Sequence, residues 1–254
     1  MAARNARPAG ILPVLGAARA GLATVSTYLL AFPLTFIGSC LGCFCVLLGL
    51  RDFTRAGIAV WAHLPFWLVG RRLHVRGREH IARTGRYLVV ANHASMYDVP
   101  ALFAVLPGMA FMGRGYLQRI PVFGWFLRSM RYIPVETGSL RNAAEALREA
   151  IRRTHEGLSV GIFPEGSRTP TGEVQHLKRG FVRILREGKL DLLPVRIDGT
   201  WALKPKHHWY MDPRERIAVT VRPSIPHDRI AHLSDHEIVE RVRGILATNG
   251  EVPA

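Results

Sequence analysis

Cysteine is scarce in this sequence. Only three of its 254 residues are cysteine, and all three lie in one apolar stretch, as Cys40, Cys43 and Cys45. Three cysteines without a neighbouring histidine do not complete a four-ligand zinc site, so we predict no bound metal. They also provide no disulfide framework, which favours a reducing, intracellular setting. We therefore expect the three cysteines to be small buried thiols.

Acidic residues are also few. The sequence has 19 Asp and Glu against 34 Lys and Arg, so its formal net charge is +15. A surface this basic indicates an anionic partner, which is a nucleic acid, an acidic carrier or substrate, or an anionic membrane. The arginines alternate with apolar core patterns, and there is neither a helix-turn-helix signal nor an aromatic platform for stacking bases. We therefore predict no nucleic-acid partner.

Charge is missing altogether from residues 21–50. About 20 apolar residues are enough for a membrane-spanning helix, and this run is longer, with Pro33 near its middle. It ends in no small-x-small cleavage site, so we do not interpret it as a signal peptide. Arginines flank both ends, at Arg19 and Arg51, so the positive-inside rule selects no orientation for a single span. This symmetry favours a re-entrant helical hairpin over one kinked span, and a buried hairpin packed on the domain is a third alternative.

A second apolar segment, residues 56–70, is too short to span a bilayer comfortably. Its aromatic residues Trp61, Phe66 and Trp67 suit the membrane–water interface. A basic cluster follows, in which each charge near an anionic surface contributes about 1 kcal/mol of attraction. This cluster consists of Arg71, Arg72, Arg76 and Arg78. We therefore predict that residues 1–70 form an N-terminal membrane-associated helical region that anchors the protein.

The patterns beyond residue 70 are those of a globular α/β domain, which we assign to residues 71–254. Short apolar or alternating runs predict strands at residues 73–77, 86–92, 109–113, 158–164, 190–197 and 216–223. Amphipathic or capped segments predict helices at residues 98–106, 139–155 and 235–247. Ser139 is the expected N-cap of the second helix, and Ser234 with Glu237 forms a capping box for the third. Since strands and helices alternate, we predict the fold class α/β, with a mixed sheet flanked by helices.

A first polar motif, Asn-His-Ala-Ser-Met-Tyr-Asp, occupies residues 92–98 directly after a predicted strand. Five helical residues rotate a side chain by about 140°, so His93 and Asp98 meet only if His93 lies in a turn and Asp98 in the next element. A histidine can act as a general base near neutral pH, and a carboxylate can orient it. Ser95 offers a rival interpretation as a hydrolase nucleophile, although no G-x-S-x-G elbow surrounds it.

A second polar motif, Phe-Pro-Glu-Gly-Ser-Arg, occupies residues 163–168, also after a predicted strand. It should therefore emerge at the same sheet edge as the first motif, where open α/β sheets bind ligands. Gly166 permits an unusual turn or a close backbone approach. Arg168 carries a planar fork suited to phosphate, and Glu165 is expected to hold that arginine or to contact an acceptor hydroxyl.

Together these motifs resemble those of the glycerolipid acyltransferase family, N-H-x-x-x-x-D and F-P-E-G-[ST]-R. The best-known bacterial members of this family are 1-acyl-sn-glycerol-3-phosphate acyltransferases. Three further blocks agree in order, namely R-G-Y-L-Q-R-I-P-V-F-G-W at 114–125, L-K-R-G-F at 177–181 and L-P-V at 193–195. The resemblance spans residues 60–225, and several ordered motifs are far more specific than a single H-x-x-x-x-D.

The resemblance implies a reaction and a cellular place. An acyl thioester, on coenzyme A or acyl carrier protein, donates its acyl group to the hydroxyl of a lysophospholipid, with 1-acyl-sn-glycerol-3-phosphate giving phosphatidic acid. The thioester is a co-substrate, and no cofactor is implied. The partners are membrane lipids and the thioester carrier. The expected location is the bacterial inner membrane, with the active site on the cytoplasmic side.

The resemblance also implies residue roles. His93 is the base that removes the hydroxyl proton and Asp98 orients it, so the oxygen attacks the thioester without an acyl-enzyme intermediate. The implied substrate-binding residues are Arg114, Glu165, Gly166, Ser167, Arg168 and Lys178. Residues 193–195 would line an acyl channel.

Two positions depart from the family pattern. Arg114 stands where the family usually has lysine, and Thr137 stands where an arginine thought to hold phosphate is expected. Arg131 and Arg141 are near in sequence and are candidate substitutes. Without such a substitute, another lysolipid, such as a lyso-ornithine lipid, is an alternative acceptor.

Overall fold

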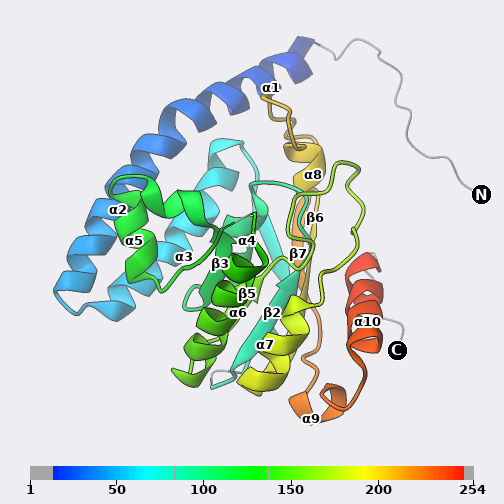
Figure 1. The fold of residues 1–254 in the computed structure, drawn as a ribbon. Coiled ribbons are helices and arrows are strands. Elements are labelled where there is room, and N and C mark those ends of the chain that lie inside the picture. The colour runs from blue at the N-terminus through cyan, green and yellow to red at the C-terminus, as the bar shows by residue number, and fades with distance from the viewer. Residues whose placement is uncertain (1–13, 83, 137, 249–254) are drawn as a thin grey trace, which may run out of the picture.

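A seven-stranded mixed sheet organises the chain in a computed structural model, which describes residues 14–82, 84–136 and 138–248 (Figure 1). The strand order is β1-β7-β6-β2-β5-β3-β4; among the described strands β6 and β7 pair in antiparallel fashion and the other pairs are parallel. The predicted α/β class with a mixed sheet is confirmed. The strands are β1 Leu73–Arg76, β2 Tyr87–Ala91, β3 Ala110–Arg114, β4 Ile133–Val135, β5 Val160–Ile162, β6 Asp191–Asp198 and β7 Ile217–Val221.

Strand β2 shows why the sheet is covered on both faces. All five of its residues are buried, and a continuous apolar run suits a strand with no solvent-facing side. Val89 belongs to one hydrophobic core, and Val90 to another on the opposite face. The first core includes α3 Arg51–Leu68 and α4 Asp98–Val105; the second includes α6 Leu140–His155, α7 Gly180–Gly188 and α10 Asp235–Ala247.

The predicted helix starts are confirmed by their caps. Ser139 Oγ accepts a hydrogen bond from Asn142 N at 3.1 Å, and Ser234 with Glu237 forms the complete capping box. Each cap satisfies a backbone N–H that the first turn of a helix leaves without a partner. The predicted helix at residues 98–106 is also present, as α4.

Several short elements are absent from the sequence predictions. A three-residue strand such as β4 is too short to show a periodic pattern. Helix α7, in contrast, buries one face, so its amphipathic pattern could have been predicted from the sequence. The remaining short elements are η2 Arg78–His80, η3 Gly115–Arg119, α5 Phe123–Ser129, α8 Thr200–Leu203 and α9 His227–Ile230.

The N-terminal apolar run forms one continuous helix, not the favoured hairpin within residues 21–50. Helix α1 (Val14–Ser26) passes through a π-helical turn, η1 (Thr27–Ala31), into α2 (Phe32–Leu47). The wider turn lies just before Pro33, whose ring would otherwise crowd the carbonyl group four residues earlier. A turn does follow, but only after residue 47, and its second arm is α3.

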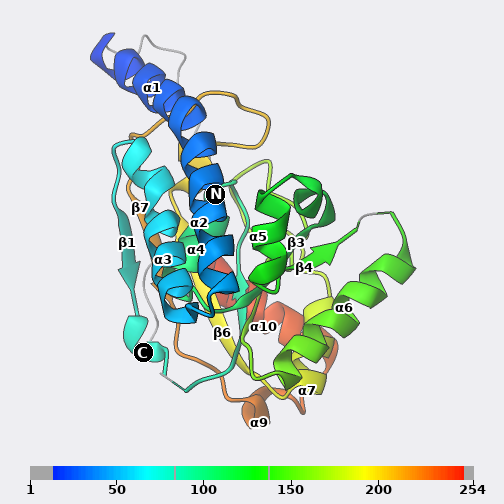
Figure 2. The same ribbon diagram turned by 90° about the vertical axis from the view of Figure 1, so that its left-hand side faces the viewer.

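The N-terminal helices lie on the outside of the molecule (Figure 2), and many of their large apolar side chains are exposed. Residues 16–47 form a helix long and apolar enough to cross a membrane, and only 6% of its most apolar window is buried. The buried-hairpin alternative is therefore wrong. The prediction of buried thiols is wrong for the same reason, because Cys40 is exposed and Cys43 and Cys45 are half-buried.

Helix α3 belongs partly to the core of the α/β domain. Phe66, expected at the membrane interface, is buried against Tyr97 with ring centroids 5.6 Å apart. Trp61 is half-buried and donates from Nε1 to Thr35 Oγ1 at 3.1 Å. Trp67 is exposed, as an interfacial residue would be. The domain boundary at residues 70 and 71 stays a prediction, although α3 shares a core with the sheet.

Candidate active site

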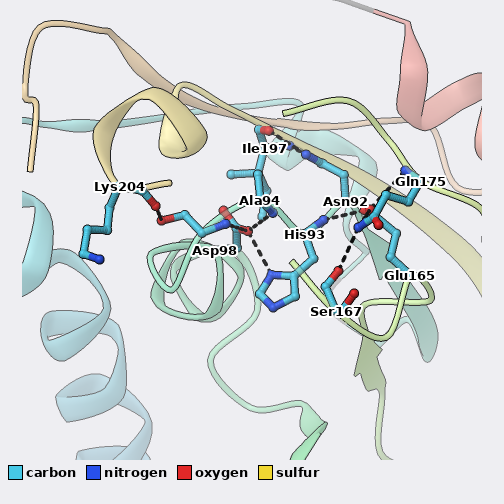
Figure 3. A network of polar contacts seen from close by, with 10 residues as sticks. Asn92, His93, Ala94, Asp98, Glu165, Ser167, Gln175, Ile197 and Lys204 are labelled. Atoms are coloured by element: carbon cyan, nitrogen blue, oxygen red, sulfur yellow. Dashed lines mark hydrogen bonds and ion pairs between the residues drawn. The ribbon is translucent and has the colours of Figure 1, made fainter. Parts of the chain in front are cut away.

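The carboxyl ends of four parallel strands define one edge of the sheet. Residue His93 follows β2, Glu165 follows β5, and Arg114 ends β3. Strand β6 ends beside α8, which leads to Lys204. Asn92 ties the turn after β2 to β6, because its side chain donates to Ile197 O at 2.8 Å and accepts from Ile197 N at 2.7 Å (Figure 3). Both polar motifs therefore emerge at the edge where open α/β sheets bind ligands.

His93 and Asp98 meet in the geometry that their spacing requires. His93 lies in the turn after β2, and Asp98 is the first residue of α4. The distance from His93 Nδ1 to Asp98 Oδ2 is 2.9 Å. The same oxygen accepts the N–H groups of Ala94 at 2.6 Å and Ser95 at 2.7 Å. Asp98 is fully buried, so these three donors hold its carboxylate in one orientation.

The imidazole of His93 is held from two directions. Its ring stacks on the ring of Phe163 with centroids 4.1 Å apart and an interplanar angle of 2°. Since Nδ1 donates to Asp98, the neutral ring presents its lone pair at Nε2. The His93 side chain is 17% exposed. A base prepared in this way can accept a proton from a group outside the protein.

Glu165 braces the His93 turn. Its Oε1 accepts from His93 N at 2.7 Å, and its Oε2 accepts from Gln175 N at 3.1 Å and Gln175 Nε2 at 3.2 Å (Figure 3). Gln175 Nε2 also donates to Ser167 O at 3.2 Å. Burial raises the pKa of the Glu165 carboxyl, while these hydrogen bonds oppose that rise. The expected ion pair with Arg168 is not among the contacts of the described residues, and the contact with an acceptor hydroxyl stays a prediction.

The remaining predicted binding residues add positive charge to the loops at this edge of the sheet. Gly166 has a φ of +71°, and a Cβ there would lie 2.8 Å from Lys178 Nζ. A glycine at residue 166 therefore permits both the backbone turn and the approach of the lysine. Arg168 is half-buried, whereas Lys178 and Arg114 are exposed.

Sequence reasoning missed the buried cation Lys204. Its carbonyl accepts the Ser95 hydroxyl at 2.8 Å, and its Nζ donates to His208 O. Burial lowers the pKa of Lys204, and the charge of Arg168 lowers it further. Gln175 was missed as well, because it lies in a loop ten residues after Glu165, and such a distance carries no periodic signal. Only the folded chain shows either contact.

The candidate substitutes for the missing arginine are engaged elsewhere. Arg131 pairs with Glu156 at 3.5 Å, and Arg141 pairs with Glu145 at 3.0 Å. Thr137 lies outside the described residues. As for metals, no group of three or more His, Cys, Asp or Glu side chains that could hold an ion occurs in the part of the chain that the structure describes.

Known proteins are similar to the part of the chain that carries this site. The sequence profile of the Acyltransferase family matches residues 72–198, which are 127 of the 254 residues. The 1-acyl-sn-glycerol-3-phosphate acyltransferase of Borreliella burgdorferi is 32% identical over 139 residues, which are 54% of this chain and 55% of the relative. The Pseudomonas aeruginosa protein of the same name is 27% identical over 178 residues, 68% of this chain and 69% of that one. The chain spans about half the length of the first curated relatives that it matches.

A solved structure is similar over nearly the whole chain. It is the crystal structure of the 1-acyl-sn-glycerophosphate (LPA) acyltransferase PlsC from Thermotoga maritima, with a TM-score of 0.82 and 26% sequence identity. The match covers 91% of this chain and 94% of that one, so at most about a tenth of either chain lies outside it. From the profile match over half of its length, together with these relatives, we conclude that the chain belongs to the Acyltransferase family.

Proposed function

We propose that this protein transfers an acyl group from an acyl thioester to the free hydroxyl of 1-acyl-sn-glycerol-3-phosphate, giving phosphatidic acid. The observation that carries the proposal is the 2.9 Å contact between His93 and Asp98 at a sheet edge braced by Glu165. The curated relatives and the solved structure named above support this acceptor, since their names specify it.

The geometry suggests a direct transfer. Nε2 of His93 takes the proton of the acceptor hydroxyl while the oxygen attacks the thioester carbonyl carbon. The carbon–sulfur bond then breaks, and the departing thiolate takes the proton from the imidazolium. The negative charge of Asp98 stabilises the imidazolium and orients it. Base catalysis of this kind contributes about 10²–10⁴-fold to the rate.

The acceptor phosphate is assigned to the cations beside the second motif. Arg168 supplies a guanidinium fork for two parallel hydrogen bonds to phosphate. Lys178, with Nζ beside Gly166, adds a point charge, and Arg114 contributes from the end of β3. In this assignment Glu165 positions His93, and Ser167 lies in the turn that presents Arg168.

A second acceptor class is favoured by one observation. Arg131 and Arg141 each pair with a glutamate, and these glutamates compete with a phosphate for the two guanidinium groups. A site with one phosphate ligand fewer suits a lysolipid whose headgroup carries less negative charge. A lyso-ornithine lipid is such an acceptor.

The hydrolase alternative receives no support from the geometry. The hydroxyl of Ser95 is fully buried and donates its proton to Lys204 O. A serine nucleophile would instead donate that proton to His93. The backbone N–H of Ser95 is likewise committed to Asp98. Ser95 thus acts as a structural part of the His93 turn in our proposal.

We also assign the protein to the cytoplasmic surface of the bacterial inner membrane, with the long N-terminal helix lying along the bilayer. The α/β domain contacts this helix from Thr24, which binds Met211 N at 2.9 Å, to Gly42, which packs on Phe126. At a rise of 1.5 Å per residue these contacts cover about 27 Å, close to the roughly 30 Å of the hydrocarbon core. A spanning orientation would therefore pull the domain itself into lipid.

The decisive experiment is acyl transfer by purified protein in detergent. Labelled acyl-CoA and acyl carrier protein thioesters are supplied with a panel of lysolipid acceptors, and the products are separated. We expect labelled phosphatidic acid from 1-acyl-sn-glycerol-3-phosphate, with loss of the product in His93→Ala. Preference for a phosphate-free acceptor would overturn the headgroup assignment and leave the chemistry intact. Covalent acylation of Ser95 would instead support the hydrolase.

A further inference from the structure

We propose that the loop of residues 205–210, which reads Pro-Lys-His-His-Trp-Tyr, forms a second membrane contact at headgroup level, beside the N-terminal helix. The proposal rests on the membrane-bound function argued above. It assigns a membrane contact to a part of the α/β domain that lies outside all of the acyltransferase motifs.

The loop is fastened to the apolar helix at its C-terminal end and to Lys204 at its start. The hydroxyl of Tyr28, in η1, donates to Trp209 O at 3.0 Å. Directly after the loop, Met211 N donates to Thr24 Oγ1 at 2.9 Å. At the other end, Lys204 Nζ donates to His208 O. In both ribbon views the chain between α8 and β7 rises beside α1 (Figures 1 and 2).

The loop presents aromatic rings to the outside. Trp209 is 73% exposed and Tyr210 is 43% exposed. Their rings pack edge to face with centroids 6.1 Å apart, and the ring of His208 lies 5.4 Å from that of Tyr210. The rings thus stabilise one another without being buried in the domain. Tryptophan and tyrosine concentrate at the membrane–water interface, where an apolar ring with a polar atom is well solvated.

The surroundings favour a lipid surface as the partner. On the same turns of helix that hold the loop, Leu22, Val25 and Leu29 are exposed. The aromatic loop and these exposed apolar side chains therefore lie along the same stretch of the N-terminal helix. Lys206, within the loop, adds a positive charge that an anionic headgroup would attract.

The loop also connects the membrane surface to the catalytic turn. Lys204, which directly precedes the loop, accepts the Ser95 hydroxyl through its carbonyl. Ser95 in turn donates its backbone N–H to Asp98. Seating the loop at the headgroups would thus hold the His93 turn at a defined height above the lipid from which the acceptor comes.

The test is binding of the full chain to vesicles of phosphatidylcholine, with and without phosphatidylglycerol. We expect Trp209→Ala to weaken binding about tenfold to both kinds of vesicle, since an apolar ring is lost. Lys206→Ala should weaken binding about fivefold, and only when phosphatidylglycerol is present. Leu140→Ala is the matched control, because Leu140 is 92% exposed but begins α6. It should bind as the unaltered protein does.

A second measurement remains informative if Trp209→Ala does not fold. Brominated lipids quench the fluorescence of tryptophans that reach the interface, and Trp209→Phe should lose a measurable part of that quenching. Equal quenching in both proteins, or equal vesicle binding by Trp209→Ala, would overturn the proposal. Weaker binding of acyl carrier protein with unchanged vesicle binding would overturn it too, because the loop would then dock a protein. Acyl transfer in detergent separates this result from the proposed function, since Trp209→Ala should keep its activity there.

Discussion

Two segments of this chain have nearly the same letters but opposite surroundings. Strand β2 reads Tyr-Leu-Val-Val-Ala at residues 87–91, and η1 reads Thr-Tyr-Leu-Leu-Ala at residues 27–31. All of β2 is buried between two helical layers, whereas η1 buries Thr27 and exposes Tyr28, Leu29 and Leu30. In η1 the polar side chain thus faces the protein and the apolar ones face outward. That inversion is expected where the outside is lipid.

The two segments also serve the site differently. Strand β2 delivers His93 to the sheet edge, where Asp98, Glu165 and Phe163 hold it. Segment η1 reaches the same motif from outside, because Thr27 Oγ1 lies 3.4 Å from Tyr97 OH. The His93 turn therefore lies between the sheet and a helix suited to lipid. The following predictions test this division, in order of decreasing effect.

The largest loss of activity is expected at His93, just after the carboxyl end of β2. We expect His93→Ala to lower kcat for acyl transfer about 10²–10⁴-fold, because the base is removed. The free energy of unfolding should fall by about 1–3 kcal/mol, because the buried Asp98 carboxylate loses one of its three donors. Asp98→Asn provides the comparison, as it keeps the shape but loses the charge that stabilises the imidazolium. Full activity of His93→Ala would refute the assigned base.

A matched pair of leucines tests the surroundings directly. Leu88→Ala, in β2, should lower the free energy of unfolding by about 2–5 kcal/mol, because it leaves a cavity in a closed core. Leu29→Ala, in η1, should lower it by less than about 0.5 kcal/mol in detergent, yet weaken vesicle binding. Chemical denaturation and vesicle sedimentation measure the two effects. Similar losses of stability would show that η1 faces protein.

Gln175 tests how strongly the second motif positions the first. Gln175→Ala removes one side-chain donor to Glu165 Oε2 and one to Ser167 O. We expect kcat to fall about tenfold with a smaller change in KM, since a hydrogen bond to a charged group contributes about 1.5–3 kcal/mol. Gln175→Glu replaces the donor by a second carboxylate beside Glu165, so it should lower kcat as well. An unchanged pH profile and kcat in both variants would exclude a positioning role.

The smallest effect, on stability, is expected at the contact between Thr27 in η1 and Tyr97 in the first polar motif. Tyr97 is buried, and burial raises its pKa to about 12, so its hydroxyl stays protonated. Tyr97→Phe removes only the contact with Thr27 and should lower the free energy of unfolding by about 1 kcal/mol. Thr27→Val removes the same contact from the other side, so the double variant should be no less stable than either single one. Additive losses would mean that the two hydroxyls act independently.

Much of the site was predictable because its parts are local. The step from His93 to Asp98 requires a turn followed by a helix, and both are present. The capping box of α10 was likewise readable, since its two members are three residues apart. The contact between Glu165 and His93 could not be predicted, because these residues are 72 positions apart and meet only through the parallel pairing of β2 and β5.

The sequence by itself determined the family, the pairing of His93 with Asp98, the alternation of strands and helices, and the presence of a long apolar N-terminal run. These features depend on residue type and short spacing, which the covalent chain sets. Only the tertiary structure decided which apolar residues are covered, that the turn falls after residue 47, and that Phe66 lies inside while Trp209 lies outside. The physical reason is that burial is a property of what packs against a side chain, and an apolar side chain is suited equally to a protein core and to lipid.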